Sequence, residues 1–372
     1  TVDDAHPLRF DAADVPCLDH MQRKLTDLCE TAAARDLHQR MLTLPIHDPR
    51  RHAWLEAADK ARIAGKWLAR FPSERLNFVC SNAEFDEMLA SYLGVDSPAA
   101  SAPGVLGVTF RANAGGTRAV VTRDGFGIES LTMPGNSWTD AHDQILNDLY
   151  ALIQRSGLRG RLEPHEIFSN AVPPEVIAEM AEQDVQYGRK PRISPDLDIN
   201  INGRQILMDL KRIHVSRNRY YPNQNVASTR GGALEARADT VNREYQRKAA
   251  VMDRKAAEWR RQRGIAMPEG SPTAASILRS YPPVRGLVFG STAGGGSKDV
   301  GRLCDAIAAE TAQRSWRQLG ARTRTEAYSA IAGYVRARVG FSAAHAHARL
   351  RLSRIERVGH SGRTAGLMGA GG

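Results

Sequence analysis

Two aspartates and a lysine stand in a short stretch whose pattern predicts a β-hairpin. In the stretch from Ile193 to His214, two runs of alternating polar and apolar residues flank the dipeptide Asn202-Gly203. An Asn-Gly dipeptide between such runs is the strongest short-range hairpin signal, because both residues accept the left-handed backbone of a tight turn. If the turn pairs the two runs, Asp196 to Asp198 lie across from Asp209 to Lys211.

Carboxylates and an ammonium group would then converge on one polar patch of an otherwise apolar sheet. Hard cations such as Mg²⁺ take oxygen ligands, commonly one or two carboxylates together with waters and substrate phosphate. A lysine beside such a cation can position or deprotonate a water and neutralise charge on a phosphate group during its transfer. The pattern therefore predicts metal-dependent chemistry on a phosphate ester. The alternative interpretation is an exposed hairpin with a ladder of solvated charges.

The spacing of these residues resembles the motif of the PD-(D/E)XK nuclease superfamily. Pro195-Asp196 is followed, thirteen residues after the aspartate, by Asp209-Leu210-Lys211. The resemblance implies that Asp196 and Asp209 are catalytic metal ligands and that the Leu210 carbonyl is a candidate third ligand. It implies that Lys211 is the catalytic lysine, that the cofactor is Mg²⁺ or Mn²⁺, and that the fold is α+β with a core in the order αβββαβ.

In that core a helix precedes the first strand and carries an acidic residue or a histidine toward the site. The apolar spacing from Ser137 to about Arg155 predicts such a helix, which makes His142 and its neighbour Asp143 candidate contributors. The other candidate accessory residues are Glu163, Glu166 and Asp198.

Residues 163–358 resemble, more narrowly, the restriction-like endonuclease region of non-LTR retroelements and of retroelement-like open reading frames of algae and protists. Besides the hairpin, the resemblance rests on Arg237 to Lys248, Gly286 to Gly290 with Asp299-Val300, and the helical run Arg336 to Arg351. It implies a nucleic-acid partner, DNA rather than RNA, a nuclear location, and a place in a longer polyprotein or a viral or retroelement assembly. No Cys-Cys-His-Cys knuckle and no polymerase Asp-Asp motif accompany it in this sequence.

The net charge of +10 is concentrated in two segments. Residues 211–263 contain fourteen Lys and Arg against five Asp and Glu, and residues 314–363 contain eleven Arg against two Glu, so the rest of the chain sums to −8. Such localisation is typical of a surface that binds a polyanion such as nucleic acid, although solubility or an acidic protein partner is the alternative. The candidate nucleic-acid-binding residues are Arg212, Arg217, Arg219, Tyr220, Arg237, Tyr245 and Lys248.

Composition and periodicity divide the 372 residues into five parts. We expect a helical N-terminal domain (1–95), a linker (96–104), the nuclease core with preceding β-hairpins (105–300), a basic helical extension (301–358) and a disordered tail (359–372). We expect helices at 18–44, 51–69, 83–93, 233–263, 297–312, 323–339 and 342–358, strand-like runs at 105–111, 118–122 and 126–133, and a buried parallel strand at 284–290.

The cysteine spacing and the hydropathy of the sequence limit the cellular compartments in which we expect the protein. The four cysteines are far apart and match neither a zinc-binding spacing nor a disulfide framework. No apolar run is long enough to span a membrane. We therefore expect an intracellular, non-secreted protein that has no membrane partner, and, because the first residue is Thr1, we expect the chain to be part of a longer product.

The predicted function is cleavage of phosphodiester bonds by a divalent-metal-dependent endonuclease. Two alternatives stay open from the sequence. One is a non-catalytic nucleic-acid-binding or viral structural protein on a nuclease-like scaffold, and the other is an RNA endonuclease.

Overall fold

The computed structural model describes residues 18–45, 48–70, 72–102, 105, 109–111, 120–122, 137–186, 194–213, 230–267 and 269–369. The chain divides into two units at Pro45. Within the first unit lies α1 (Leu18–Thr43), a helix that the sequence predicted. All other elements belong to the second unit, residues 46–372.

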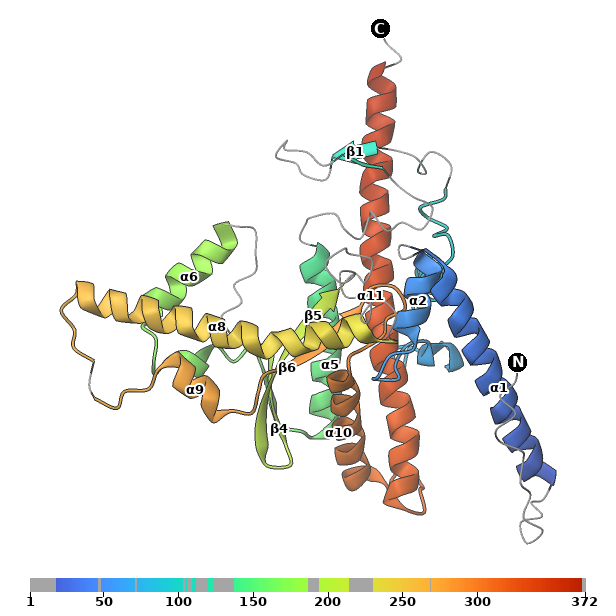
Figure 1. Ribbon diagram of the computed structural model, residues 1–372, viewed down its shortest axis with the longest axis horizontal. Coiled ribbons are helices and arrows are strands. Elements are labelled where there is room, and N and C mark those ends of the chain that lie inside the picture. The colour runs from blue at the N-terminus through green and yellow to red at the C-terminus, as the bar shows by residue number, and fades with distance from the viewer. Residues whose placement is uncertain are drawn as a thin grey trace. The chain divides into compact units, whose positions relative to one another are not determined.

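A four-stranded mixed sheet lies at the centre of the second unit (Figure 1). Its strands, in spatial order, are β3 (Gly160–Leu162), β4 (Leu197–Ile201), β5 (Arg204–Ile213) and β6 (Arg285–Gly290). The first three pair antiparallel, and β6 joins β5 in parallel, as predicted for the apolar run at 284–290. The fold is therefore mixed α+β.

The predicted hairpin is present, and its turn fixes the register of the strands. Asn202 and Gly203 have φ values of 52° and 78°, the left-handed region that a two-residue hairpin turn requires. In the register of this two-residue turn, Asp196 is across from Asp209. Asp198 pairs with Leu207, so it does not lie across from Lys211 as the sequence predicted. The difference follows from the antiparallel direction of the strands, because the residue numbers of β5 fall as those of β4 rise, so Asp196 to Asp198 are across from Asp209 to Leu207.

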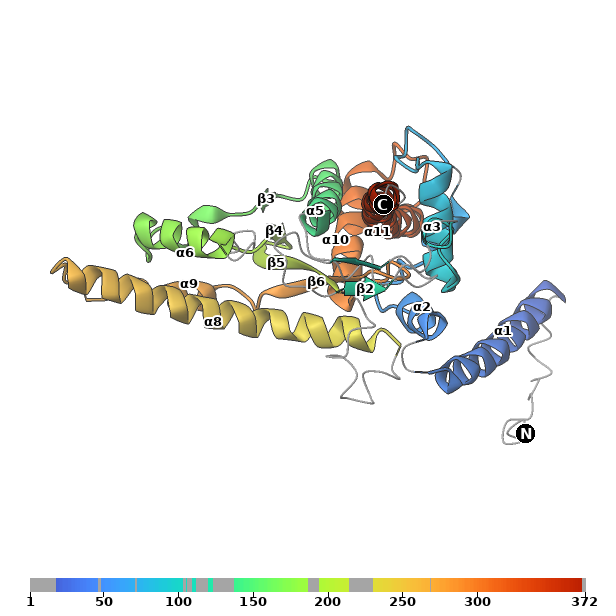
Figure 2. The same cartoon turned by 90° about the horizontal axis from the view of Figure 1, so that it is seen from above.

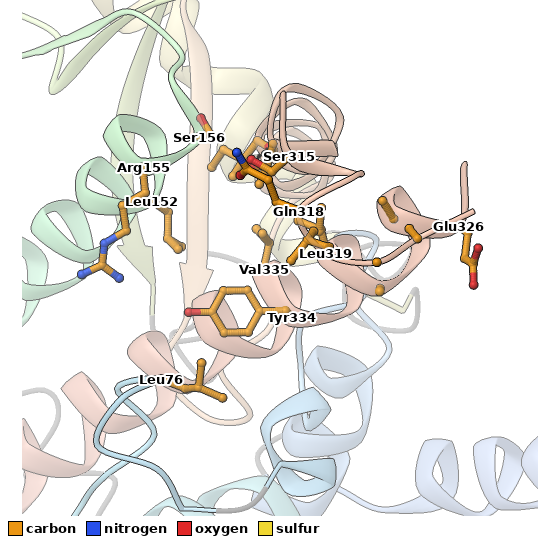
Figure 3. A pocket seen from close by; sticks show the side chains of 17 residues that line it. Leu76, Leu152, Arg155, Ser156, Ser315, Gln318, Leu319, Glu326, Tyr334 and Val335 are labelled. Atoms are coloured by element: carbon orange, nitrogen blue, oxygen red, sulfur yellow. Dashed lines mark hydrogen bonds between the residues drawn. The ribbon is translucent and has the colours of Figure 1, made fainter. Parts of the chain in front are cut away.

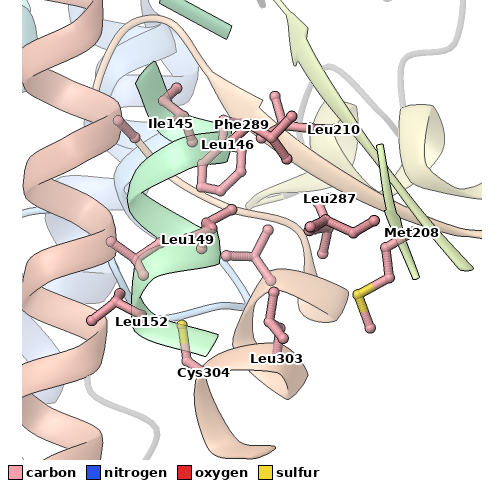
Figure 4. Packing of buried hydrophobic residues seen from close by; sticks show 14 of the residues in the cluster. Ile145, Leu146, Leu149, Leu152, Met208, Leu210, Leu287, Phe289, Leu303 and Cys304 are labelled. Atoms are coloured by element: carbon pink, nitrogen blue, oxygen red, sulfur yellow. The ribbon is translucent and has the colours of Figure 1, made fainter. Parts of the chain in front are cut away.

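Helices cover both faces of the sheet (Figure 2). The first face packs against α5 (Ser137–Ser156), α10 (Lys298–Ser315) and α11 (Arg324–Gly369). Figure 4 shows part of this apolar cluster. The second face packs against α6 (Pro174–Gln186), α8 (Gly232–Gln262) and α9 (Ala274–Ser280). Successive side chains of β5 point to opposite faces of the sheet. Met208 and Leu210 therefore belong to the apolar cluster on the first face, and Leu207 belongs to the cluster on the second face.

The helix predicted over 51–69 is instead two elements. α2 (Pro49–Ala57) is followed by the 3-10 helix η2 (Lys66–Ala69). Between them Arg62 and Gly65 have φ values of 57° and 67°, and left-handed residues cannot continue an α-helix. The next helix, α3 (Asn82–Leu93), begins at a capping box of Ser81 and Glu84 and agrees with the prediction.

α11 is one continuous helix where the sequence predicted two helices and a disordered tail. Gly340 does not end the helix. It lies against the backbone of Ile63, where a Cβ atom would overlap the carbonyl oxygen. α11 also contacts α3, α5 and α10. The expected helical domain beyond Pro45 and the expected basic extension are therefore packed into the same unit as the sheet.

Two helices lie outside the ranges in which the sequence predicted helices. They are α6, which follows the 3-10 helix η3 (His165–Phe168), and α9, which begins at a capping box formed by Thr273 and Ser276. A separate antiparallel pair, β1 (Thr109–Arg111) and β2 (Val120–Thr122), falls within two of the three predicted strand-like runs. The third run, 126–133, lies outside the described residues.

Within the described ranges, no helix is both long and apolar enough to cross a membrane.

The glycine-rich loop that follows β6 is fixed by two buried carboxyl groups from the region of α2. Oε1 of Glu56 accepts hydrogen bonds of 2.7–3.3 Å from the backbone N–H groups of Thr292, Ala293 and Gly295. Asp59 accepts a hydrogen bond of 2.8 Å from the N–H of Gly296. Burial raises the pKa of Glu56 to about 7 and that of Asp59 to about 6, against the opposing effect of these hydrogen bonds.

Candidate functional site

Asp209 and Lys211 lie on one face of β5, beneath α8. The side chain of Asp209 is enclosed, and its Oδ2 atom forms an ion pair with Nζ of Lys211. The hydroxyl group of Tyr245 donates to Oδ1 of Asp209 at 2.8 Å and lies 3.0 Å from the carbonyl oxygen of Ser194. Tyr245 therefore joins α8 to the end of the hairpin where the acidic residues meet.

Asp196 completes the cluster immediately before β4. Its Oδ2 atom accepts a hydrogen bond of 2.6 Å from the backbone N–H of Leu210 and lies 3.3 Å from Nε2 of His142 on α5. The other ring nitrogen of His142 lies 3.0 Å from Asp143. The backbone carbonyl of Asp196 accepts from the N–H of Glu163 at 2.9 Å. Asp196 is thus held by β5, by α5 and by the segment after β3.

The two carboxyl groups have opposite pKa shifts. Burial raises the pKa of Asp209, and the negative charge of Asp196 adds to this effect while Lys211 opposes it. Burial also acts to raise the pKa of Asp196, but the hydrogen bond and charge of His142, with the charge of Lys211, lower it on balance. With both carboxyl groups ionised, two negative charges face the ammonium group of Lys211 and the imidazole of His142, so the cluster has a net negative charge, which favours a cation, when His142 is neutral.

The donor set suits a hard cation. The N–H and C=O of one strand residue point to the same side, so the carbonyl of Leu210 faces the edge where Asp196 accepts its N–H. Asp196, Asp209 and that carbonyl are oxygen donors, and Mg²⁺ commonly takes few protein ligands and keeps several waters. In the described part of the chain no group of three or more His, Cys, Asp or Glu side chains is placed to hold an ion. Waters and substrate oxygens would therefore complete the coordination.

Asp198 and Glu166 belong to a different cluster. Both pair with Arg161 on β3, and Nη2 of Arg161 donates to Oδ2 of Asp198 at 2.6 Å. Gln205 on β5 also contacts this oxygen, at 3.4 Å. These two candidate accessory residues are therefore engaged at the β3 edge, and Asp196, Asp209, Lys211 and His142 form the site without them.

The flank of α8 beside Tyr245 carries more charge. Arg237 donates two hydrogen bonds, of 2.6 and 2.9 Å, to Glu244, and the positive charge of Lys211 acts on the same carboxylate. Nζ of Lys248 lies 4.3 Å from the centroid of the Tyr245 ring. Tyr245 was a candidate nucleic-acid contact, but it is buried and positions Asp209 instead. Glu244 was not among the predicted site residues. The only feature of the sequence that could have indicated it is its spacing of seven and four residues from Arg237 and Lys248, which places the three on one side of a helix.

A second charged cluster lies on the opposite face of β5. Nε of Arg212 donates to Nε2 of His347 at 2.9 Å, and its Nη1 donates to the carbonyl of Trp138 at 3.0 Å. The guanidinium groups of Arg212 and Arg354 lie 4.5 and 5.7 Å from the centroid of the Trp138 ring. Burial, and then the charge of Arg354, lower the pKa of Arg212 to about 9. The remaining candidates, Arg217, Arg219 and Tyr220, lie outside the described residues.

Several arginines of α11 form ion pairs with acidic residues of the same chain. Arg336, Arg338 and Arg351 form ion pairs with Asp305, Asp148 and Glu87, respectively. The charge pattern had suggested that the basic segment 314–363 binds a polyanion, and these three arginines instead join α11 to its neighbours.

A separate cavity of about 660 Å³ lies where the C-terminal end of α5 meets α10 and α11 (Figure 3). Its lining includes Leu152, Leu319 and Tyr334, and it contains none of the residues described above. Leu152 is ten residues along α5 from His142, so these two residues are separated by about 15 Å along the helix axis.

Comparison of the chain with protein-family models, curated proteins and solved structures finds no match.

Proposed function

We propose that the chain is a divalent-metal-dependent endonuclease that hydrolyses phosphodiester bonds, with DNA as its preferred substrate. The observation that carries this proposal is the meeting of Asp196, Asp209 and Lys211 at one end of the β4–β5 hairpin. The elements α5, β3, β4, β5, α8 and β6 follow one another in the αβββαβ order of the PD-(D/E)XK superfamily, with η3 and α6 inserted between β3 and β4 and α9 inserted between α8 and β6. This order supports the same assignment.

Asp196 and Asp209, with the Leu210 carbonyl, would hold Mg²⁺ or Mn²⁺. A divalent cation bound there supplies Lewis-acid stabilisation of a phosphate oxygen and makes a water more acidic. Lys211 would orient the attacking water and offset the negative charge that develops on the phosphate. Because its ammonium group already lies against Asp209, only a small movement is needed for either role.

Neighbouring residues fix the two carboxylates. Tyr245 bonds Oδ1 of Asp209, and both His142 and the Leu210 N–H contact Oδ2 of Asp196. Orientation of this kind matters because uncatalysed phosphate-ester hydrolysis is so slow that such sites supply on the order of 20 kcal/mol, mostly by positioning and charge neutralisation. Loss of either carboxylate should therefore abolish turnover.

The test is nicking of supercoiled plasmid DNA and cleavage of single-stranded oligonucleotides in the presence of Mg²⁺ or Mn²⁺. Wild type should cleave, and Asp209→Ala and Lys211→Ala should not. Asp239→Ala is the matched control, because Asp239 is an exposed carboxylate on the same helix as Tyr245. Equal activity in wild type and both site variants would overturn the proposal. The same assay with an RNA substrate decides between DNA and RNA.

One observation favours a second candidate function, non-catalytic binding of nucleic acid. Arg243, Arg247, Arg254 and Arg261 are exposed along the side of α8 opposite Tyr245. A protein of this kind would bind DNA in EDTA with strong salt dependence and would cleave in no metal. Melting temperatures with and without Mn²⁺ separate the two functions, since only a metal site is stabilised by the ion.

A further inference from the structure

The cavity of about 660 Å³ at the C-terminal end of α5 has the size of a small-molecule site (Figure 3). Such sites commonly have volumes of about 300–1,000 Å³, whereas packed protein interiors leave few voids larger than one water molecule. All residues that line the cavity, and their neighbours along the chain, lie within the described ranges. The cavity therefore calls for a functional explanation.

The wall of the cavity is mostly apolar. Ala327, Ala330 and Ile331 line it from α11, and the short side chains of the two alanines leave space in front of the helix. Leu76 and Leu319 line it from two turns of the chain and are 43% and 57% exposed. Single exposed leucines are common, but two on one concave surface are typical of a groove that binds an apolar ligand.

Arg155 of α5 and Tyr334 of α11 come to the same level of the cavity. Two contacts show that these helices run antiparallel, namely Gln144 with His345 at 3.5 Å and Asp148 with Ser342 at 2.5 Å. Seven residues further along each helix, about two turns, the same register brings Arg155 opposite Tyr334 and its neighbour in sequence. Both residues line the cavity.

The charges of the cavity lie at its two ends. Arg155 and Glu326 are its charged lining residues, and Figure 3 shows them far apart, with the carboxylate of Glu326 directed away from the other labelled side chains. Glu326 also accepts a hydrogen bond of 2.8 Å from the backbone N–H of Arg322. At the other end the hydroxyl group of Tyr334 points to the side on which Arg155 lies. The end near α5 therefore suits an anionic group, and the wall between the two ends suits an apolar one.

We propose that this cavity binds a carboxylic acid with a long apolar chain, such as a fatty acid. Its carboxylate accepts hydrogen bonds from the guanidinium group of Arg155 and the hydroxyl group of Tyr334, because a carboxylate is the matching acceptor for both donors. Its chain lies along the wall formed by α10 and α11 and covers Leu76 and Leu319, which removes their apolar surface from water. The site goes beyond the proposed nuclease function and does not depend on it.

The first experiment is calorimetric titration of the full chain with three probes that share one chain length. They are decanoate, decanol and decyltrimethylammonium, each below the concentration at which it forms micelles. Decanoate should bind at least fivefold more tightly than decanol, and the cation more weakly than either. The heat-capacity change should be negative, because apolar surface is buried. No binding of decanoate, or equal binding of decanoate and the cation, would overturn the proposal.

The second experiment repeats the titration with two variants and their controls. Ala330→Trp fills the cavity and should weaken all binding at least tenfold, whereas Ala250→Trp, at an exposed alanine of α8, should change nothing. Arg155→Gln should weaken decanoate at least fivefold and leave decanol unchanged. Its control is Arg279→Gln, because Arg279 is exposed on α9 and does not line the cavity.

Unchanged binding of decanoate in Ala330→Trp would place the ligand elsewhere and would overturn the proposal. So would an equal loss of decanoate and decanol in Arg155→Gln, because the guanidinium group would then act on the structure and not on the carboxylate. Arg155 is exposed, so its variant keeps the fold and decides the question even where Ala330→Trp does not fold. Plasmid cleavage is measured separately, so binding of decanoate without cleavage would refute the nuclease function alone.

Discussion

The hydroxyl group of Tyr245 donates to Oδ1 of Asp209 across 2.8 Å, and so a side chain of α8 sets the orientation of a carboxylate on β5. Both groups are almost fully buried, which makes the hydrogen bond costly to lose. The same contact leaves Oδ2 of Asp209 facing Lys211.

Replacement of Tyr245 by Phe should therefore lower kcat for DNA cleavage by about tenfold or more while changing KM little, because the carboxylate loses its orientation but no substrate contact is removed. The unfolding free energy should fall by about 1–3 kcal/mol, since the buried Oδ1 loses its donor. Kinetics and urea unfolding measure both effects. Tyr92→Phe serves as the control, because Tyr92 is a partly exposed tyrosine on α3, and an equal loss of kcat in that variant would contradict the positioning role.

His142 lowers the pKa of Asp196 against the effect of burial. In His142→Phe we expect that pKa to rise, so that Asp196 is protonated over a wider acidic range and binding of Mn²⁺ is lost at a higher pH than in wild type. Titration of Mn²⁺ binding between pH 5 and 8 by calorimetry or by electron paramagnetic resonance measures the shift. Superimposable pH profiles for the two proteins would exclude an influence of His142 on the metal-binding carboxylate.

Glu56 makes stability depend on pH. Its folded-state pKa is about 7 against an ordinary value of 4.5, so its contribution is complete below about pH 4.5 and is lost as the pH rises through about 7. The full shift corresponds to about 3 kcal/mol. In Glu56→Gln the amide oxygen can keep all three hydrogen bonds to the loop, because each of them reaches Oε1. The difference in unfolding free energy between variant and wild type should grow in favour of the variant from pH 5 to pH 8. A constant difference would show that the Glu56 carboxyl group does not titrate in this range.

Two glycines of α11 should respond to alanine in opposite directions. At Gly340 a Cβ would overlap the backbone of Ile63, so Gly340→Ala should destabilise the protein by about 1–3 kcal/mol. At Gly333 the nearest atom is the end of the flexible Arg70 side chain, at 3.4 Å. Gly333→Ala should therefore stabilise the helix by about 0.5–1 kcal/mol. Thermal and urea unfolding of both variants test the pair, and stabilisation by both substitutions would rule out the close contact at Ile63.

The sequence alone determined the hairpin and the opposition of its two aspartates. Both depend on interactions over a few residues, since Asn202-Gly203 sets the turn and alternation sets the faces. The three-four spacing of apolar residues such as Leu234, Val241 and Met252 likewise indicates which side of α8 is buried. These features are local, so their signals lie within one short window of sequence.

Only the tertiary structure decided which side chains reach the aspartates from elsewhere. His142 lies 54 positions from Asp196, Tyr245 lies 36 positions from Asp209, and His347 lies 135 positions from Arg212. Each contact depends on how a helix crosses a face of the sheet, which is set by packing of whole apolar surfaces. The same holds for Gly340, which lies inside α11 although the sequence predicted that a helix ends there. Glycine at this position lets the backbone of α11 pack closely against the backbone of Ile63, and no local sequence pattern indicates that contact.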